Sequence, residues 1–201
     1  METLNNLPIY NITIEDKEDG MYCISLVDEP AVEKQYMLFD QNKQPQLFQI
    51  QNTDEQIIMG VVMRADYPIY RCDNQLGEYY VTYSKETIKQ MAEKYLQDDK
   101  QHYFSFNHNG KPLNNIYLQQ LFIKDIEKGI NPNGFEDIED GSLFAILKVE
   151  DNELWNEIKH GNYQGFSLEG YFSYNPDKDN NNKETELLED IVNLLKQIDN
   201  K

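Results

Sequence analysis

Short apolar runs, separated by polar or glycine-containing turns, fill most of the chain between residues 57 and 174. Many of them alternate apolar and polar residues, as strands with one buried face do. We therefore predict roughly seven strands. They fall in the segments MYCISLV (21–27), QIIMGVVMRAD (56–66), the hairpin YRCDNQLGEYYVTY (70–83), QHYFSFNHNG (101–110), NIYLQQLFIKDI (115–126), SLFAILKVE (142–150) and GFSLEGYFSY (165–174).

Three other segments have the apolar spacing of amphipathic helices. The clearest is SKETIKQMAEKYLQDD (84–99), in which Ser84 is a suitable N-cap. Its predicted apolar face consists of Ile88, Met91, Ala92, Tyr95 and Leu96. DNELWNEIKHG (151–161) predicts a short helix that stops at Gly161, and ETELLEDIVNLLKQI (184–198) predicts a terminal amphipathic helix.

These elements indicate an α+β, mainly β domain or a barrel-like β domain with a helical C-terminal appendage. We expect residues 1–39 to supply N-terminal strands and residues 40–56, which are rich in glutamine, to form a linker or surface loop. The main body is predicted over 57–174. A second linker follows at 175–183, and the terminal helix occupies 184–201.

The charge of the chain is strongly unbalanced, with 18 Lys and Arg against 36 Asp and Glu and a net charge of −18. Such a surface repels phosphate backbones, so nucleic acid is not an expected partner. The two cysteines, Cys23 and Cys72, suit a reducing compartment, although a single disulfide would also fit the count. Because no apolar run approaches the ~20 residues that cross a bilayer, we expect an intracellular, soluble protein without a membrane partner.

Metal and cofactor motifs are weak or missing in the sequence. There is no cluster of Cys and His, no HExxH, and no glycine-rich nucleotide loop. Residues 177–188 imitate the start of a calcium loop with Asp177, Asp179 and Asn181. That segment lacks the glycine at the sixth loop position, and Leu188 stands where the bidentate glutamate belongs. We expect no metal and no cofactor.

Ser167 is a candidate nucleophile in the stretch GNYQGFSLEGYF (161–172). Strand alternation places Phe166, Leu168 and Phe172 on one face, and Ser167, Glu169 and Tyr171 on the other. The second face either meets solvent or lines a cleft. A serine hydroxyl attacks efficiently only when a neighbouring base takes its proton, and the GxSxG elbow of α/β-hydrolases is missing here.

The chain contains three histidines that could act as such a base. His102 and His160 have sufficient structural explanations, on the surface and in the last turn of a helix. His108 follows Phe104 and Phe106 at a spacing of two residues, which predicts that it shares their face and leaves the core at its rim before Asn109-Gly110 turns the chain. A spacing of 59 positions (167 − 108) does not by itself bring His108 to Ser167.

Several segments together resemble the phage prohead proteases. They are ISLVDEPAV (24–32), GVVMRADYPIYR (60–71), GEYYVTYSKETI (77–88), FSFNHNG (104–110) and LWNEIKHGNYQGFSLEGYF (154–172). The resemblance covers roughly residues 20 to 174 and is strongest to the branch of phage or prophage serine proteases. It implies a herpesvirus-protease-like β-barrel flanked by helices, and a serine endopeptidase of capsid maturation. The implied substrates are scaffolding and major capsid proteins, cleaved inside the assembling prohead in the host cytoplasm. A homo-oligomer is left open.

The resemblance also implies site residues. Ser167 matches the family's nucleophile and His108 its general base. Many prohead proteases carry an SLV-x-x-PA strand after the nucleophile, whereas here ISLVDEPA precedes everything else, which suggests a circular permutation. For the acid that orients His108 we predict Asp28 first, Glu169 second and Asp125 third. Two alternatives stay open. The chain could be a catalytically silent structural or scaffold-core protein, or it could be a precursor whose terminal helix is removed during maturation.

Overall fold

The computed structural model describes residues 3–15, 17–28, 48–52, 55–74 and 76–172. These residues form eleven strands and two helices, which confirms a mainly β, α+β fold. The strands are β1 (Thr3–Leu4), β2 (Leu7–Ile12), β3 (Gly20–Val27), β4 (Phe48–Asn52), β5 (Ile57–Met63), β6 (Ile69–Asp73), β7 (Gly77–Tyr83), β8 (Phe104–Phe106), β9 (Ile116–Ile123), β10 (Leu143–Val149) and β11 (Gly165–Tyr171). The helices are α2 (Lys85–Gln97) and α3 (Asn152–Lys159).

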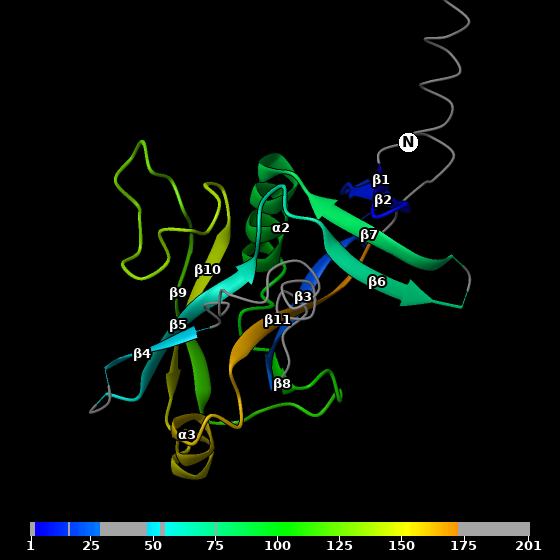
Figure 1. The fold of residues 1–201 in the computed structure, drawn as a ribbon. Helices are drawn as coiled ribbons and strands as arrows, with labels where there is room; N and C mark the ends of the chain where they lie inside the picture. The colour runs from blue at the N-terminus through cyan, green and yellow to red at the C-terminus, as the bar shows by residue number, and fades with distance from the viewer. Residues whose placement is uncertain (1–2, 16, 29–47, 53–54, 75, 173–201) are drawn as a thin grey trace, which may run out of the picture.

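The strands belong to three open sheets with the orders β1-β2-β7-β6, β4-β5-β10-β9 and β11-β3-β8 (Figure 1). No closed barrel forms among the described residues, so that part of the prediction is corrected. The hydrogen-bonded ladders stop at β4 and β9 in one sheet and at β11 and β8 in another. The sheets instead pack their apolar faces on one another. The predicted terminal helix at 184–201 lies outside the described residues.

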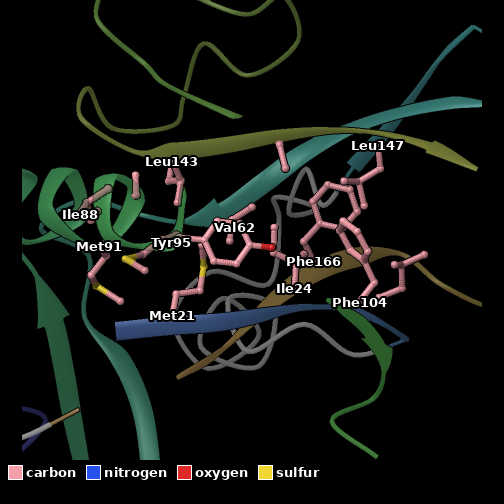
Figure 2. Close-up of a cluster of buried hydrophobic side chains, with 14 of the residues drawn as sticks. Met21, Ile24, Val62, Ile88, Met91, Tyr95, Phe104, Leu143, Leu147 and Phe166 are labelled. Carbon is pink, nitrogen blue, oxygen red and sulfur yellow. The ribbon is translucent and has the colours of Figure 1, made fainter. Parts of the chain in front are cut away.

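The core lies between the β11-β3-β8 sheet and the β4-β5-β10-β9 sheet, and α2 closes one end (Figure 2). Ile24, Phe104 and Phe166 face this core from the first sheet and are at most 3% exposed. Val62 and Leu147 meet them from the second sheet. Burial of such apolar surface is the main stabilising term of the fold, and it fixes which face of β11-β3-β8 points away from the core.

Helix α2 begins where the sequence predicted, because the Ser84 side chain accepts a hydrogen bond from the Thr87 N–H at 3.1 Å. Four of the five predicted apolar positions are buried: Ile88, Met91, Ala92 and Tyr95. Leu96 was predicted to join them and is instead 48% exposed. It lies on the flank of the helix that lines a hollow beside β9, and not on the face that carries Tyr95 into the core. The prediction of Gly161 as the stop of α3 is confirmed, because its φ of 78° is left-handed.

The predicted linker at 40–56 is wrong in its second half. Residues 48–52 form β4, which pairs with β5 antiparallel. The Phe48 ring packs on Phe166 with ring centroids 5.5 Å apart. FQIQN does alternate, but it contains only two apolar residues, Phe48 and Ile50, and the glutamine-rich composition of the segment favoured a loop. Residues 1–39 were expected to supply N-terminal strands, and β1, β2 and β3 lie within that range.

Candidate active site

Three serines form a row across the outward face of the β11-β3-β8 sheet. Ser167 on β11 lies opposite Ser25 on β3, and Ser25 lies beside Ser105 on the parallel strand β8. Residues directly opposite one another in a sheet share a face. The neighbouring positions Phe166, Ile24 and Phe104 point into the core. The same alternation therefore supplies both the apolar packing and a polar surface on the other side.

Glu169 occupies the next row on this face, opposite Cys23. The register shifts directly after it, because Gly170 pairs with Met21 and leaves Tyr22 as an extra residue on β3. Such a bulge re-aims side chains, and here the Tyr22 hydroxyl donates to Glu169 Oε2 at 3.3 Å. A Cβ on Gly170 would lie 2.6 Å from the carbonyl oxygen of Gly20, so this close approach requires glycine.

His108 does not share the face of Phe104 and Phe106, which corrects the sequence prediction. Strand β8 ends at Phe106, and a tight turn follows in which the Asn109 N–H donates to the Phe106 carbonyl at 2.8 Å. Both central residues of this turn are left-handed, with φ values of 41° at Asn107 and 56° at His108. Left-handed non-glycine residues carry local strain that the surrounding structure must hold. The turn brings His108 to the face that carries the serines. A continued strand would have placed it on the opposite face, with Phe104 and Phe106.

The imidazole of His108 lies between a hydroxyl and a carboxylate. Its Nε2 is 3.1 Å from Ser167 Oγ, and its Nδ1 is 3.6 Å from Glu169 Oε1. The first distance is a hydrogen bond. The second is an electrostatic contact slightly longer than one, as is common in resting active sites. The His108 side chain is 45% exposed, whereas that of Glu169 is 11% exposed. Solvent therefore reaches the imidazole but little of the carboxylate.

Hydrogen bonds hold the Glu169 carboxylate in its buried position. Ser25 Oγ donates to Oε1 at 2.5 Å, and Ser105 Oγ donates to the same oxygen. Burial opposes ionisation of Glu169, but the hydrogen bonds from Ser105 and Ser25 and the charge of His108 outweigh it and lower its pKa. Burial raises the pKa of the neighbouring Cys23 thiol to about 12, which argues against Cys23 as a nucleophile.

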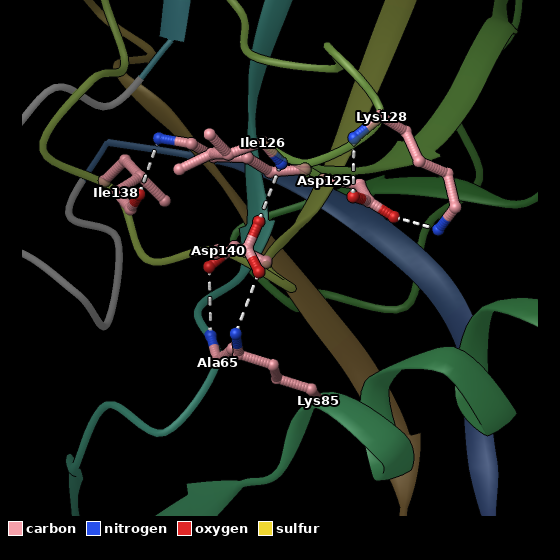
Figure 3. Close-up of polar contacts among 9 residues, drawn as sticks. Ala65, Lys85, Asp125, Ile126, Lys128, Ile138 and Asp140 are labelled. Atoms are coloured by element: carbon pink, nitrogen blue, oxygen red, sulfur yellow. Dashed lines mark hydrogen bonds and ion pairs between the residues drawn. The ribbon is translucent and has the colours of Figure 1, made fainter.

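Asp28, the first choice for the acid, lies just beyond the end of β3 and is exposed. Its backbone N–H donates to Asn107 Oδ1 at 3.1 Å, so it supports the turn that carries His108. The carboxylate recorded against the His108 ring is that of Glu169, the second choice. Asp125, the third, lies in the loop after β9, where it bonds Lys128 (Figure 3).

The two other histidines have structural contacts. His102 is exposed and lies 3.6 Å from Asp99, and His160 caps α3 with its Nδ1 2.6 Å from the Asn156 carbonyl. Sequence reasoning missed Ser25 and Ser105. The available signal was a serine at the centre of two otherwise apolar strands, CISLV and FSF, where a valine or alanine would pack without needing a partner.

A separate hollow of about 640 Å³ lies between α2 and the end of β9. Its lining includes Leu96, Leu121 and Ile130, together with charged side chains of both signs, and Ser167, His108 and Glu169 are not among them. The hollow is therefore not the cleft of the Ser167 site. Within the part of the chain that the structure describes, no group of three or more His, Cys, Asp or Glu side chains is arranged to hold a metal. None of the described helices is long and apolar enough to cross a membrane.

A family model described as "Putative phage serine protease XkdF" matches residues 45–174, which is more than half of the chain. The chain belongs to this family. Neither the curated proteins nor the solved structures include a significant match. The matched region contains Ser105, His108, Ser167 and Glu169, whereas β3, with Ser25 and Tyr22, lies N-terminal to it.

Proposed function

We propose that this protein is a serine endopeptidase that uses Ser167 as nucleophile, His108 as general base and Glu169 as the acid behind it. The observation that carries the proposal is the 3.1 Å contact between Ser167 Oγ and His108 Nε2, with the Glu169 carboxylate 3.6 Å from Nδ1 on the other side of the ring. Nucleophile, base and orienting acid stand in the order that acyl-transfer chemistry needs. We assign the third role to Glu169 in place of Asp28 because of this contact.

In the proposed reaction, His108 takes the Ser167 proton while Oγ forms a bond to the scissile carbonyl carbon. Backbone N–H groups beside the site stabilise the resulting oxyanion. The C–N bond then breaks, and His108 gives its proton to the leaving amine. Water, deprotonated by His108, attacks the acyl-enzyme and restores the serine. Glu169 stabilises the imidazolium that forms in each half of the cycle.

We further propose that the substrates are the scaffolding and major capsid proteins of a phage head, cleaved inside the assembling prohead in the host cytoplasm. Membership in a family of phage serine proteases supports this place of action. In this proposal β3 replaces the SLV strand that other prohead proteases carry after the nucleophile, as in a circular permutation. Its pairing with both β11 and β8 supports that role.

A catalytically silent head protein is the competing function. A silent protein has no need of a left-handed His108 or of a buried acid behind it, and the observed spacing therefore favours catalysis. Co-expression with the cognate scaffolding and major capsid proteins tests the substrate assignment. The wild type should process them, Ser167→Ala should leave them intact, and equal processing by both would refute the proposal.

A second experiment tests the nucleophile without a known substrate. A fluorophosphonate probe should label the wild type once: Oγ bonds to phosphorus, fluoride leaves, and His108 takes the proton. Intact mass should show one adduct, and peptide mapping should place it on Ser167. Ser142→Ala serves as the matched control, because Ser142 is buried and its hydroxyl accepts a hydrogen bond from the Ala65 N–H, away from the site. Labelling that survives Ser167→Ala would sink the assignment.

A further inference from the structure

The two buried hydroxyls behind Glu169 have no role in the reaction described above. Ser25 is 0% exposed and Ser105 is 3% exposed, although each lies on an otherwise apolar strand. A buried hydroxyl costs stability unless it finds a partner. Both donate to the same oxygen, Glu169 Oε1, which is the oxygen that faces His108 Nδ1. The two hydroxyls also contact each other.

We infer that Ser25 and Ser105 are positioning residues that hold the Glu169 carboxylate in place against His108. The inference rests on the proposed catalytic role of His108. It extends the machinery to β3, which lies outside the region matched by the family model. Without β3, neither the Ser25 donor nor the Tyr22 bond to Oε2 would exist.

The geometry explains why two donors are placed on one oxygen. A glutamate side chain has three rotatable bonds, and a carboxylate with one partner could swing away from the imidazole. Ser25 and Ser105 approach Oε1 from adjacent strands of one sheet, and Tyr22 binds Oε2 from the bulge. These three contacts come from rigid strands, which is how a site holds its reacting groups.

The hydroxyls also keep the carboxylate charged. The titratable groups that face Glu169 among the described residues are His108 from the turn after β8, and Tyr22 and Cys23 from β3. The hydrogen bonds from Ser105 and Ser25 are the largest of the influences that lower the pKa of Glu169, ahead of the charge of His108. Removing either hydroxyl should therefore raise that pKa.

The test uses the full chain with Ser25→Ala and Ser105→Ala as separate variants, so that either can decide if the other folds poorly. The first readout is the pKa of Glu169, followed by carboxyl ¹³C NMR and assigned with Glu169→Gln. The second is the rate of fluorophosphonate labelling at Ser167 at neutral pH. We expect the Glu169 pKa to rise in both variants. The maximal labelling rate should fall about tenfold, as expected for a lost hydrogen bond to a charged group.

Two comparisons separate positioning from a general loss of stability. Ser142→Ala removes an equally buried hydroxyl and should leave both the Glu169 pKa and the labelling rate unchanged. In a Glu169→Gln background, Ser25→Ala should cost little further labelling rate, because residues that act through one another are not additive. The inference is overturned if Ser25→Ala and Ser105→Ala behave like Ser142→Ala, or if their effects persist undiminished in the Gln background. A wild type that never labels would instead refute the proposed function, and the NMR titration distinguishes that outcome.

Discussion

Two charged side chains, the buried Lys124 and the partly buried Glu169, are satisfied in opposite ways. Lys124, 1% exposed, donates to the backbone carbonyls of Phe135, Glu136 and Ile138 at 2.9, 3.1 and 2.7 Å. All three N–H donors of the ammonium group therefore bind carbonyls in the loop that joins β9 to β10. Glu169 also accepts several hydrogen bonds, but one of its oxygens faces His108, which is 45% exposed.

The difference separates a structural group, Lys124, from Glu169, for which we propose a catalytic role. The Lys124 ammonium group has no donor left for another partner, because all three donors bind backbone carbonyls. The Glu169 cluster remains open, because its chain of contacts runs through an imidazole to the Ser167 hydroxyl and solvent. A charge whose contacts lead out to a reactive group marks a candidate functional site.

His108→Ala should lower the rate of fluorophosphonate labelling at Ser167 roughly 10³- to 10⁴-fold, because the general base is lost. The free energy of unfolding in urea should change by less than about 0.5 kcal/mol, since nearly half of the side chain is exposed. His102→Ala is the matched control, an exposed histidine in contact with Asp99. Similar labelling rates in the two variants would contradict the role of His108.

Lys124→Met should have the reverse profile. Three carbonyls lose a buried donor, which should lower the free energy of unfolding by roughly 2–4 kcal/mol. Urea titration followed by tryptophan fluorescence measures this, since Trp155 is 3% exposed in the folded state. At temperatures where the variant is folded, labelling at Ser167 should match the wild type. A variant with full stability and slow labelling would show that the Lys124 cluster is the functional one.

Glu169→Gln should slow labelling roughly 10²-fold, less than His108→Ala, because the carboxylate acts through the imidazole. Its stability should also depend differently on pH. The pKa of Glu169 is lowered from an ordinary value of 4.5, so its ionised form stabilises the fold above that pH and loses this effect as the pH falls through the lowered pKa. Urea titrations of wild type and variant between about pH 6 and 3 should therefore converge toward acid. A constant difference would contradict this.

The two cysteines should report the burial of the Glu169 face. Cys23 is buried on that face with a pKa raised to about 12, whereas Cys72 is exposed. Iodoacetamide at pH 8 should alkylate Cys72 in the native protein and reach Cys23 only after unfolding. Peptide mapping measures both. Ser25→Ala leaves Cys23 in place and should preserve its protection from alkylation. Rapid alkylation of Cys23 in the native wild type would show that this face is open to solvent.

Much of the fold follows from local pattern. Alternation predicted β8 and β11, short strand-like apolar runs predicted β3, β5, β9 and β10, and spacing with an N-cap predicted α2. These signals depend on residues a few positions apart. The hairpin predicted near Asp73 and Gly77 is confirmed, since these two residues pair at its end. Strand β4 was missed because it contains only two apolar residues, Phe48 and Ile50, within a glutamine-rich segment.

The sequence by itself determined that Ser167 and Glu169 share one face of a strand, and the resemblance selected Ser167 and His108 from among the serines and histidines. Only the tertiary structure decided which acid meets His108. That choice depends on pairings between strands more than 60 positions apart, on a bulge at Tyr22 and on a left-handed turn at Asn107 and His108. Spacing along a chain does not encode these contacts, because the register between distant strands is set by burying one face of each in a common core.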